Sequence, residues 1–193
     1  MSRIAITGNV SGTGVFTIAS PNSNTDRTLT LPDSAGTMML TDTGVTTAQM
    51  PAGSVLQVVY NSYTPWTTST DTAFVTTGLA ASITPTASSS KVLIQINANG
   101  IFNSSTSNAV LFALYKNGSL LTYLDWDFSY GVVNYGASGA YAYLDSPSTT
   151  SSTTYTLYWK SMTGSFIGIN NYAGSASNDG NTKSSFVLTE IAA

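Results

Sequence analysis

The sequence predicts an all-β protein, and three observations carry this prediction. Of the 193 residues, 42% are hydrophobic, and they fall in short runs that alternate with polar residues at a period of two. Clusters of Gly, Pro, Asn and Asp separate these runs, as they do at turns between strands. No segment shows a convincing helical period. We therefore expect an antiparallel, jelly-roll-like β sandwich preceded by a shorter β segment.

Residues 1–50 and 51–193 differ in the length of their apolar runs. The first part consists of very short apolar pieces cut by turn clusters, such as residues 20–24 and 32–36. Strands of four or five residues in so short a segment cannot enclose a core of their own. Three copies wound together could bury these apolar edges. We therefore predict a homotrimer in which residues 1–50 form an attachment or shaft segment and residues 51–193 form the head.

Strand signals lengthen in the head, where we expect about eight to ten strands. The clearest runs are residues 54–60, 74–76, 79–84, 91–98, 110–115, 154–159 and 185–191. Alternation places one set of apolar side chains on a single face: Val92, Ile94, Ile96 and Ala98. It likewise turns Tyr155, Leu157 and Trp159 inward. Asn117-Gly118 between two apolar runs predicts a tight hairpin.

Two further features of the sequence bear on what covers the surface of the head. Residues 110–115 are apolar on both faces, so we expect both faces to be covered, one of them by a neighbouring subunit. The polar stretches 103–108, 146–153 and 174–184 are expected to be loops at the ends of the sandwich. Only 8% of all residues are charged, against roughly 25% in an average globular protein. A surface solvated by the hydroxyls and amides of Ser, Thr and Asn would explain this deficit, and so would a surface partly covered by other subunits.

The amino-acid composition excludes most common kinds of catalytic site. The chain has no His and no Cys, which excludes Ser-His-Asp and Cys-His nucleophilic sites and zinc sites with N or S ligands. We therefore predict no enzymatic activity, no cofactor and no metal. Asp125 and Asp127 could form a carboxylate pair for glycoside hydrolysis, or bind calcium. The interpretation we favour is a solvated strand face opposite a buried Trp126.

Charge and hydropathy exclude two further kinds of partner. The net charge is −3 and the six Lys and Arg residues are scattered, so we expect no nucleic acid. No segment approaches about 18 continuous apolar residues, so we expect no membrane insertion. Residues 1–6 do not open a signal-peptide-like apolar stretch. Synthesis in the cytosol and release by cell lysis would fit.

Several segments are similar to those of phage fibres. Residues 29–37, with Leu40 after them, resemble a recurrent segment of phage tail-fibre and virion-fibre proteins. Four further segments resemble the head domain of many cyanophage and marine phage fibres. They are residues 54–59, 78–85, 89–94 and 187–192. The resemblance implies a homotrimer, a location in the virion and binding at the host surface. It assigns no binding residues.

Four functions follow from these observations. The first is a short trimeric tail fibre whose head contacts the host, with other virion proteins bound through residues 1–50. The second is a capsid decoration protein or head fibre, which the lack of a long shaft or large tail-docking domain leaves open. The remaining two are a polysaccharide-degrading tailspike and a cellular carbohydrate-binding module.

A host cell-surface glycan would require exposed aromatic faces beside amides or carboxylates on loops. Two segments of the head combine these groups, residues 127–136 and residues 170–181. The candidate ligand-binding residues are Tyr172, Asn171, Tyr135 and Tyr130.

Overall fold

The computed structural model describes residues 11–15, 17, 22–26, 28, 50–128, 130, 131, 133, 136–170 and 182–193, with the backbone alone at residue 127. The chain divides into two units, Met1–Met38 and Met39–Ala193. The short strands expected within residues 1–50 lie mostly outside the described residues. A functional boundary at residue 50 and attachment through residues 1–50 therefore stay predictions.

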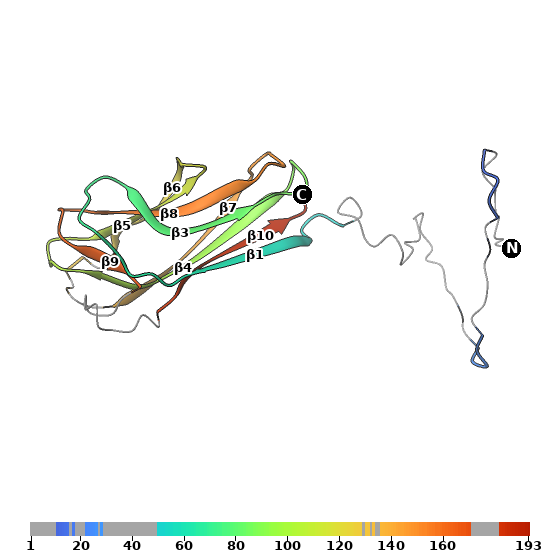
Figure 1. Ribbon diagram of the computed structural model, residues 1–193, viewed down its shortest axis with the longest axis horizontal. Coiled ribbons are helices and arrows are strands. Elements are labelled where there is room, and N and C mark those ends of the chain that lie inside the picture. The colour runs from blue at the N-terminus through green and yellow to red at the C-terminus, as the bar shows by residue number, and fades with distance from the viewer. Residues whose placement is uncertain are drawn as a thin grey trace. The chain divides into compact units, whose positions relative to one another are not determined.

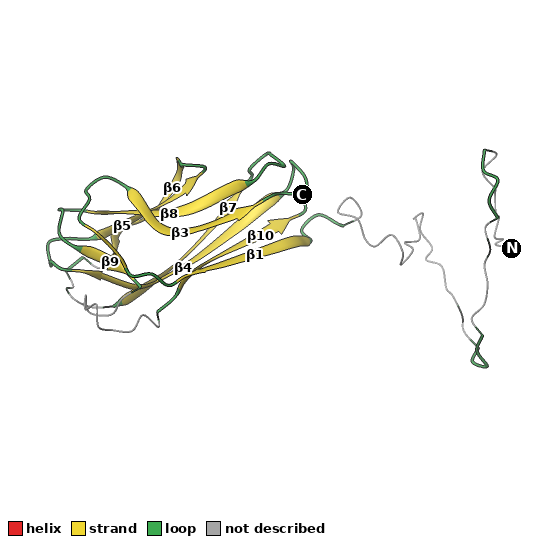
Figure 2. Ribbon diagram, in the orientation of Figure 1, coloured by secondary structure: helices red, strands yellow, loops and turns green. Residues whose placement is uncertain are grey.

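The described part of the chain contains strands and loops and no helix, as Figure 2 shows. It accordingly holds no helix of the length and apolarity that a membrane span requires. The strands are β1 (Val55–Tyr63), β2 (Thr67–Ser69), β3 (Val75–Ile83), β4 (Lys91–Asn103), β5 (Val110–Lys116), β6 (Ser119–Phe128), β7 (Ala137–Asp145), β8 (Thr153–Ser161), β9 (Ile167–Ile169) and β10 (Ser184–Ile191).

Two antiparallel sheets form the head (Figure 1). One sheet has the order β1-β10-β4, with β7 on the free side of β4 and the short β9 and β2 continuing from the end of β4. The other sheet has the order β3-β8-β5-β6. The eight long strands thus divide into β1-β10-β4-β7 and β3-β8-β5-β6, which is a jelly-roll arrangement. The predicted all-β sandwich is confirmed.

The sandwich has two ends, which we call the base and the tip. The base contains residues 50–54, where the chain enters the head, and the loop of residues 146–152. The tip contains residues 104–109 and 162–166. Hydrogen bonds join the start and the end of the head at the base, from the Gly53 amide to the Ala192 carbonyl and from the Ala192 amide to the Ser54 carbonyl.

The core lies between the inward faces of the two sheets. The face predicted for β4 is buried, and so are Tyr155, Leu157 and Trp159 of β8. Burying each large apolar side chain stabilises the fold by about 1.5–3 kcal/mol. The predicted hairpin is also present between β5 and β6. Asn117 and Gly118 there have φ of 49° and 80°, as a tight two-residue hairpin requires.

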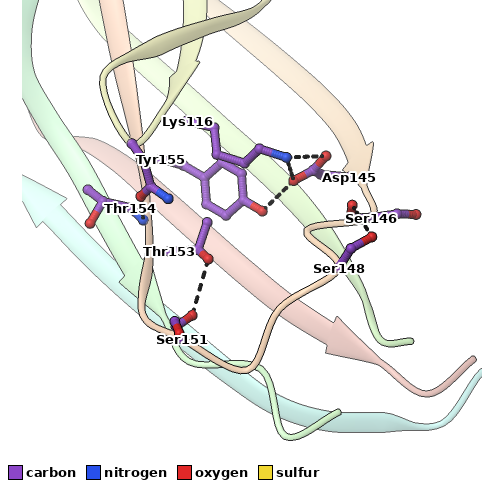
Figure 3. A network of polar contacts seen from close by, with 9 residues as sticks. Lys116, Asp145, Ser146, Ser148, Ser151, Thr153, Thr154 and Tyr155 are labelled. Atoms are coloured by element: carbon purple, nitrogen blue, oxygen red, sulfur yellow. Dashed lines mark hydrogen bonds and ion pairs between the residues drawn. The ribbon is translucent and has the colours of Figure 1, made fainter. Parts of the chain in front are cut away.

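One polar network ties the two sheets together at the base (Figure 3). Lys116 of β5 donates to both oxygens of Asp145 on β7, at 3.1 and 2.9 Å. Tyr155 of β8 donates its hydroxyl to Oδ2 of Asp145 at 2.7 Å. Burial and the neighbouring Asp145 raise the pKa of Tyr155, so its hydroxyl stays a donor. The network therefore satisfies a carboxylate that would be costly to bury alone.

A second buried carboxylate, the single glutamate of the chain, lies on the inward face of β10. Glu190 accepts hydrogen bonds from the side-chain amide of Gln57 and from the amide and hydroxyl of Thr86. Burial alone would raise the pKa of Glu190, but these hydrogen bonds outweigh it and hold the pKa below its ordinary value. Ionised Glu190 therefore joins β1, β10 and the loop after β3.

Acid is expected to weaken the head through Glu190. In the unfolded chain this carboxyl takes up a proton near its ordinary pKa of about 4.3, whereas the folded chain keeps it ionised to lower pH. The unfolded state then binds more protons, so stability falls as the pH drops through this window. Glu190→Gln should lower the free energy of unfolding by about 1–3 kcal/mol at neutral pH. Urea unfolding at about pH 7 and about pH 3 should show this difference shrinking in acid. An equal difference at both pH values would contradict the role of Glu190.

Buried amides hold the loops of the tip. The Asn108 side-chain oxygen accepts hydrogen bonds from Ser161 and Thr163, at 2.9 to 3.1 Å. Asn170 donates to the carbonyls of Tyr63 and Pro65 and accepts from the hydroxyl of Ser184. Both asparagines are fully buried. Asn170 thus has a structural role, although it lies beside the candidate ligand residue Asn171.

Candidate functional site

Aromatic side chains gather on the outer face of the β3-β8-β5-β6 sheet. We call this group the outer aromatic cluster; it consists of Phe74, Tyr115, Tyr123, Trp126 and Tyr158, with Lys160 among them. Phe74 directly precedes β3, while Trp126 and Lys160 lie near the ends of β6 and β8. Because all three of these strand ends lie at the tip, this part of the cluster lies toward the tip.

Strand register explains why the rings meet. Ala113, at the centre of β5, pairs with Tyr158 on one side and with Tyr123 on the other. The small alanine side chain leaves room for rings to close over it, and Ala113 is fully buried. Leu111, which pairs with Lys160, is also buried on this outer face. The cover expected from a neighbouring subunit over residues 110–115 is thus supplied by the chain itself, which corrects that expectation.

The rings of the cluster pack against one another in defined geometry. Tyr115 and Tyr158 are stacked, with ring centroids 3.8 Å apart and an interplanar angle of 16°. Tyr123 and Trp126 meet edge to face at 5.3 Å, and Phe74 lies 5.7 Å from Tyr123. Burial and the neighbouring tyrosines raise the pKa of Tyr115, so its hydroxyl stays protonated. Such contacts fix ring orientation on a rigid sheet.

Two of these rings remain half exposed although they pack within the cluster. Trp126 is 51% exposed and Tyr123 is 53% exposed. The Lys160 ammonium lies 5.2 Å from the centre of the Phe74 ring and 5.4 Å from that of Trp126. Both distances are within the range of cation–π attraction. The cluster therefore presents aromatic surface and a cationic group to solvent together.

The placement of Trp126 corrects the sequence interpretation of β6. Trp126 is exposed, whereas Asp125 lies on the core side, opposite Phe112, and accepts a hydrogen bond from the Tyr141 hydroxyl at 3.3 Å. Register shifts on either side of the Phe112–Asp125 pair break the simple alternation on which the interpretation rested. Burial and Asp125 raise the pKa of Tyr141, which keeps its hydroxyl a donor. The described residues contain no group of three or more potential metal ligands.

Of the four candidate ligand residues, the structure describes only Tyr130. It follows β6 at the tip and is 58% exposed. Tyr172, Asn171 and Tyr135 lie outside the described residues, so their role stays a prediction. Sequence reasoning missed the outer aromatic cluster, although one signal was available. If Tyr155, Leu157 and Trp159 point inward, then Tyr158 and Lys160 must point outward.

The outer face of the other sheet has a different character. Cross-strand pairing aligns Val58 of β1, Thr189 of β10, Leu93 of β4 and Leu144 of β7 in one row, and Tyr60 and Val187 begin the next. Val58 and Tyr60 are 59% and 64% exposed. Within these four strands, the charged side chain on the outer face is Lys91, at the base. We call this surface the outer apolar face; it consists of Val55, Val58, Tyr60, Leu93, Leu144, Val187 and Ile191.

Fold and surface together define the chain as an all-β protein with a jelly-roll domain. No family model matches the sequence, and no curated protein matches it. Among solved structures, the chain is similar to infectious bursal disease virus VP2 in the crystal structure of its subviral particle. The match has a TM-score of 0.41 and 12% identity, and it covers 72% of this chain and 38% of that chain.

Proposed function

We propose that the chain is a structural protein of a bacteriophage particle, a short trimeric tail fibre whose head contacts the host surface without catalysing a reaction. The observation that carries the proposal is the contrast between the two outer faces of one charge-poor sandwich. One face carries exposed apolar side chains such as Val58, Tyr60 and Leu144, and its charged side chain within the four described strands is Lys91. The other presents aromatic rings and a cation toward the tip.

The outer apolar face supports self-association. An exposed apolar surface on a soluble domain commonly marks an interaction site. A face with no carboxylate and a single peripheral lysine can meet its own copy without charge repulsion at the centre. Three heads packed through this face would remove Val58, Tyr60 and Leu144 from water. They would leave the three outer aromatic clusters on the outside of the trimer.

The first unit supports attachment to the virion. Residues 29–37 carry the segment that resembles phage tail and virion fibres, and they lie outside the jelly-roll domain. In the proposed fibre, residues 1–50 bind other virion proteins and residues 51–193 face outward. The low content of charged residues suits a protein that is largely packed against other subunits.

The location of the protein on phage particles tests the proposal. We expect a gold-labelled antibody against residues 51–193 to mark the tail in electron micrographs of purified particles, at sites distinct from the capsid. Label spread over the capsid would instead identify a decoration protein or head fibre. Particles that carry no label, from a lysate that contains the protein, would exclude a virion component.

A further inference from the structure

Lys160 of β8 and Lys116 of β5 both belong to the β3-β8-β5-β6 sheet, but their ammonium groups have different surroundings. Lys116 is paired with Asp145, whereas no carboxylate of the described residues lies within ion-pair distance of Lys160. The Lys160 ammonium is instead held over the rings of Phe74 and Trp126. The outer aromatic cluster thus places a positive charge, without an anionic partner among the described residues, beside half-exposed Trp126 and Tyr123.

These groups match the chemistry of one class of ligand. The C–H face of a pyranose ring is apolar and packs on flat aromatic surfaces, and a ring carboxylate pairs with an ammonium group. We propose that the outer aromatic cluster is a binding site for an acidic saccharide, a pyranose bearing a carboxylate. Trp126 provides the stacking surface, Lys160 binds the carboxylate, and the exposed Tyr123 offers a hydroxyl to the sugar. The biological meaning of this site rests on the proposed host-contacting function.

The positive charge of Lys160 indicates that the outer aromatic cluster binds an anionic ligand in preference to a second copy of the chain. If the cluster packed against the same cluster of another copy, two Lys160 ammonium groups would be buried together without a carboxylate from either cluster, which is strongly unfavourable. The outer apolar face carries no such central charge and suits self-association better. An anionic ligand, in contrast, makes use of Lys160. The position toward the tip also leaves the cluster clear of the base, where the chain enters the head.

The test uses the full chain and two probes that differ only in charge. Trigalacturonic acid carries a carboxylate on each pyranose, and its methyl ester keeps the rings but loses the charges. In ligand-observed NMR titrations we expect the acid to bind about tenfold more tightly than the ester, because only the acid pairs with Lys160. Lys160→Met should remove this preference and Lys160→Arg should keep it. Trp126→Ala should weaken both probes by about tenfold or more. Trp66→Ala is the matched control and should change neither, because Trp66 is 39% exposed in the loop between β1 and β2, outside both the cluster and the outer apolar face.

Several results would overturn the acidic-saccharide site. Equal binding of acid and ester by wild type would do so, as would unchanged binding in folded Lys160→Met and Trp126→Ala proteins. If either substitution dissociated the assembly in sedimentation, the cluster would be a subunit contact instead of a ligand site. None of these results bears on the virion location, because antibody labelling of particles tests that separately. Circular dichroism and thermal melting establish that each variant is folded.

Discussion

A carboxylate placed on the outer apolar face is expected to dissociate the proposed trimer. Val58→Asp combined with Leu144→Asp puts charges on the two edge strands of the β1-β10-β4-β7 sheet, at positions already exposed in the single head. Each subunit of a trimer would then bury unpaired carboxylates, at about 3–5 kcal/mol for each uncompensated charge. We expect the dissociation constant to rise by about 1,000-fold or more. Sedimentation equilibrium over a range of protein concentrations measures this change.

The matched control places the same charge on the other sheet. Leu120 is an exposed apolar residue at the start of β6. Leu120→Asp is expected to leave the assembly intact, because that position lies outside the proposed interface. Far-ultraviolet circular dichroism should show the double variant as a folded β protein. A double variant that sediments like wild type would exclude the outer apolar face as the subunit contact.

Loss of the Asp145 carboxylate is expected to produce the largest decrease in stability among the polar substitutions of the head. Asp145→Ala removes the acceptor for both Lys116 and Tyr155 (Figure 3) and leaves the Tyr155 hydroxyl without this partner. The side chain of Lys116 is 28% exposed and can turn to water, which moderates the penalty. We expect the free energy of unfolding to fall by about 2–4 kcal/mol. Urea unfolding of the variant and wild type gives this value.

A double-mutant cycle separates the ion pair from the tyrosine hydrogen bond. Lys116→Met keeps most of the aliphatic packing of Lys116 and leaves Asp145 bonded to Tyr155. Its effect should therefore be smaller than that of Asp145→Ala. The double variant should be more stable than the sum of the single effects predicts, since the two side chains share one network. Strict additivity would show that Lys116 and Asp145 do not stabilise the head through each other.

Local pattern was sufficient to predict much of the head. The four-residue apolar face of β4 and the inward set of β8 are both buried because residues 91–98 of β4 and the whole of β8 alternate strictly. The Asn117-Gly118 turn follows from the backbone requirement of a two-residue hairpin, which the observed φ values meet. Each of these features is set by residues close together in the sequence, so it can be predicted from the sequence alone.

Features that depend on pairing between distant strands could not be predicted in this way. The register shifts in β6 turn Trp126 outward and Asp125 toward the core, which no alternation within residues 119–128 indicates. The rings of Tyr123, Tyr158 and Phe74 come to one cluster from three separate segments of the chain. Until the sheet order is known, nothing in the sequence places them together. The outer aromatic cluster is therefore a property of the tertiary structure.

The mass of the purified chain in solution tests the central claim most directly. The proposed trimeric fibre predicts that sedimentation equilibrium at micromolar concentration gives about three times the chain mass of 20.1 kDa. Circular dichroism of the same sample should show a folded β protein. A folded species that sediments at 20.1 kDa across this concentration range would contradict the trimer, and with it the proposed role of the outer apolar face.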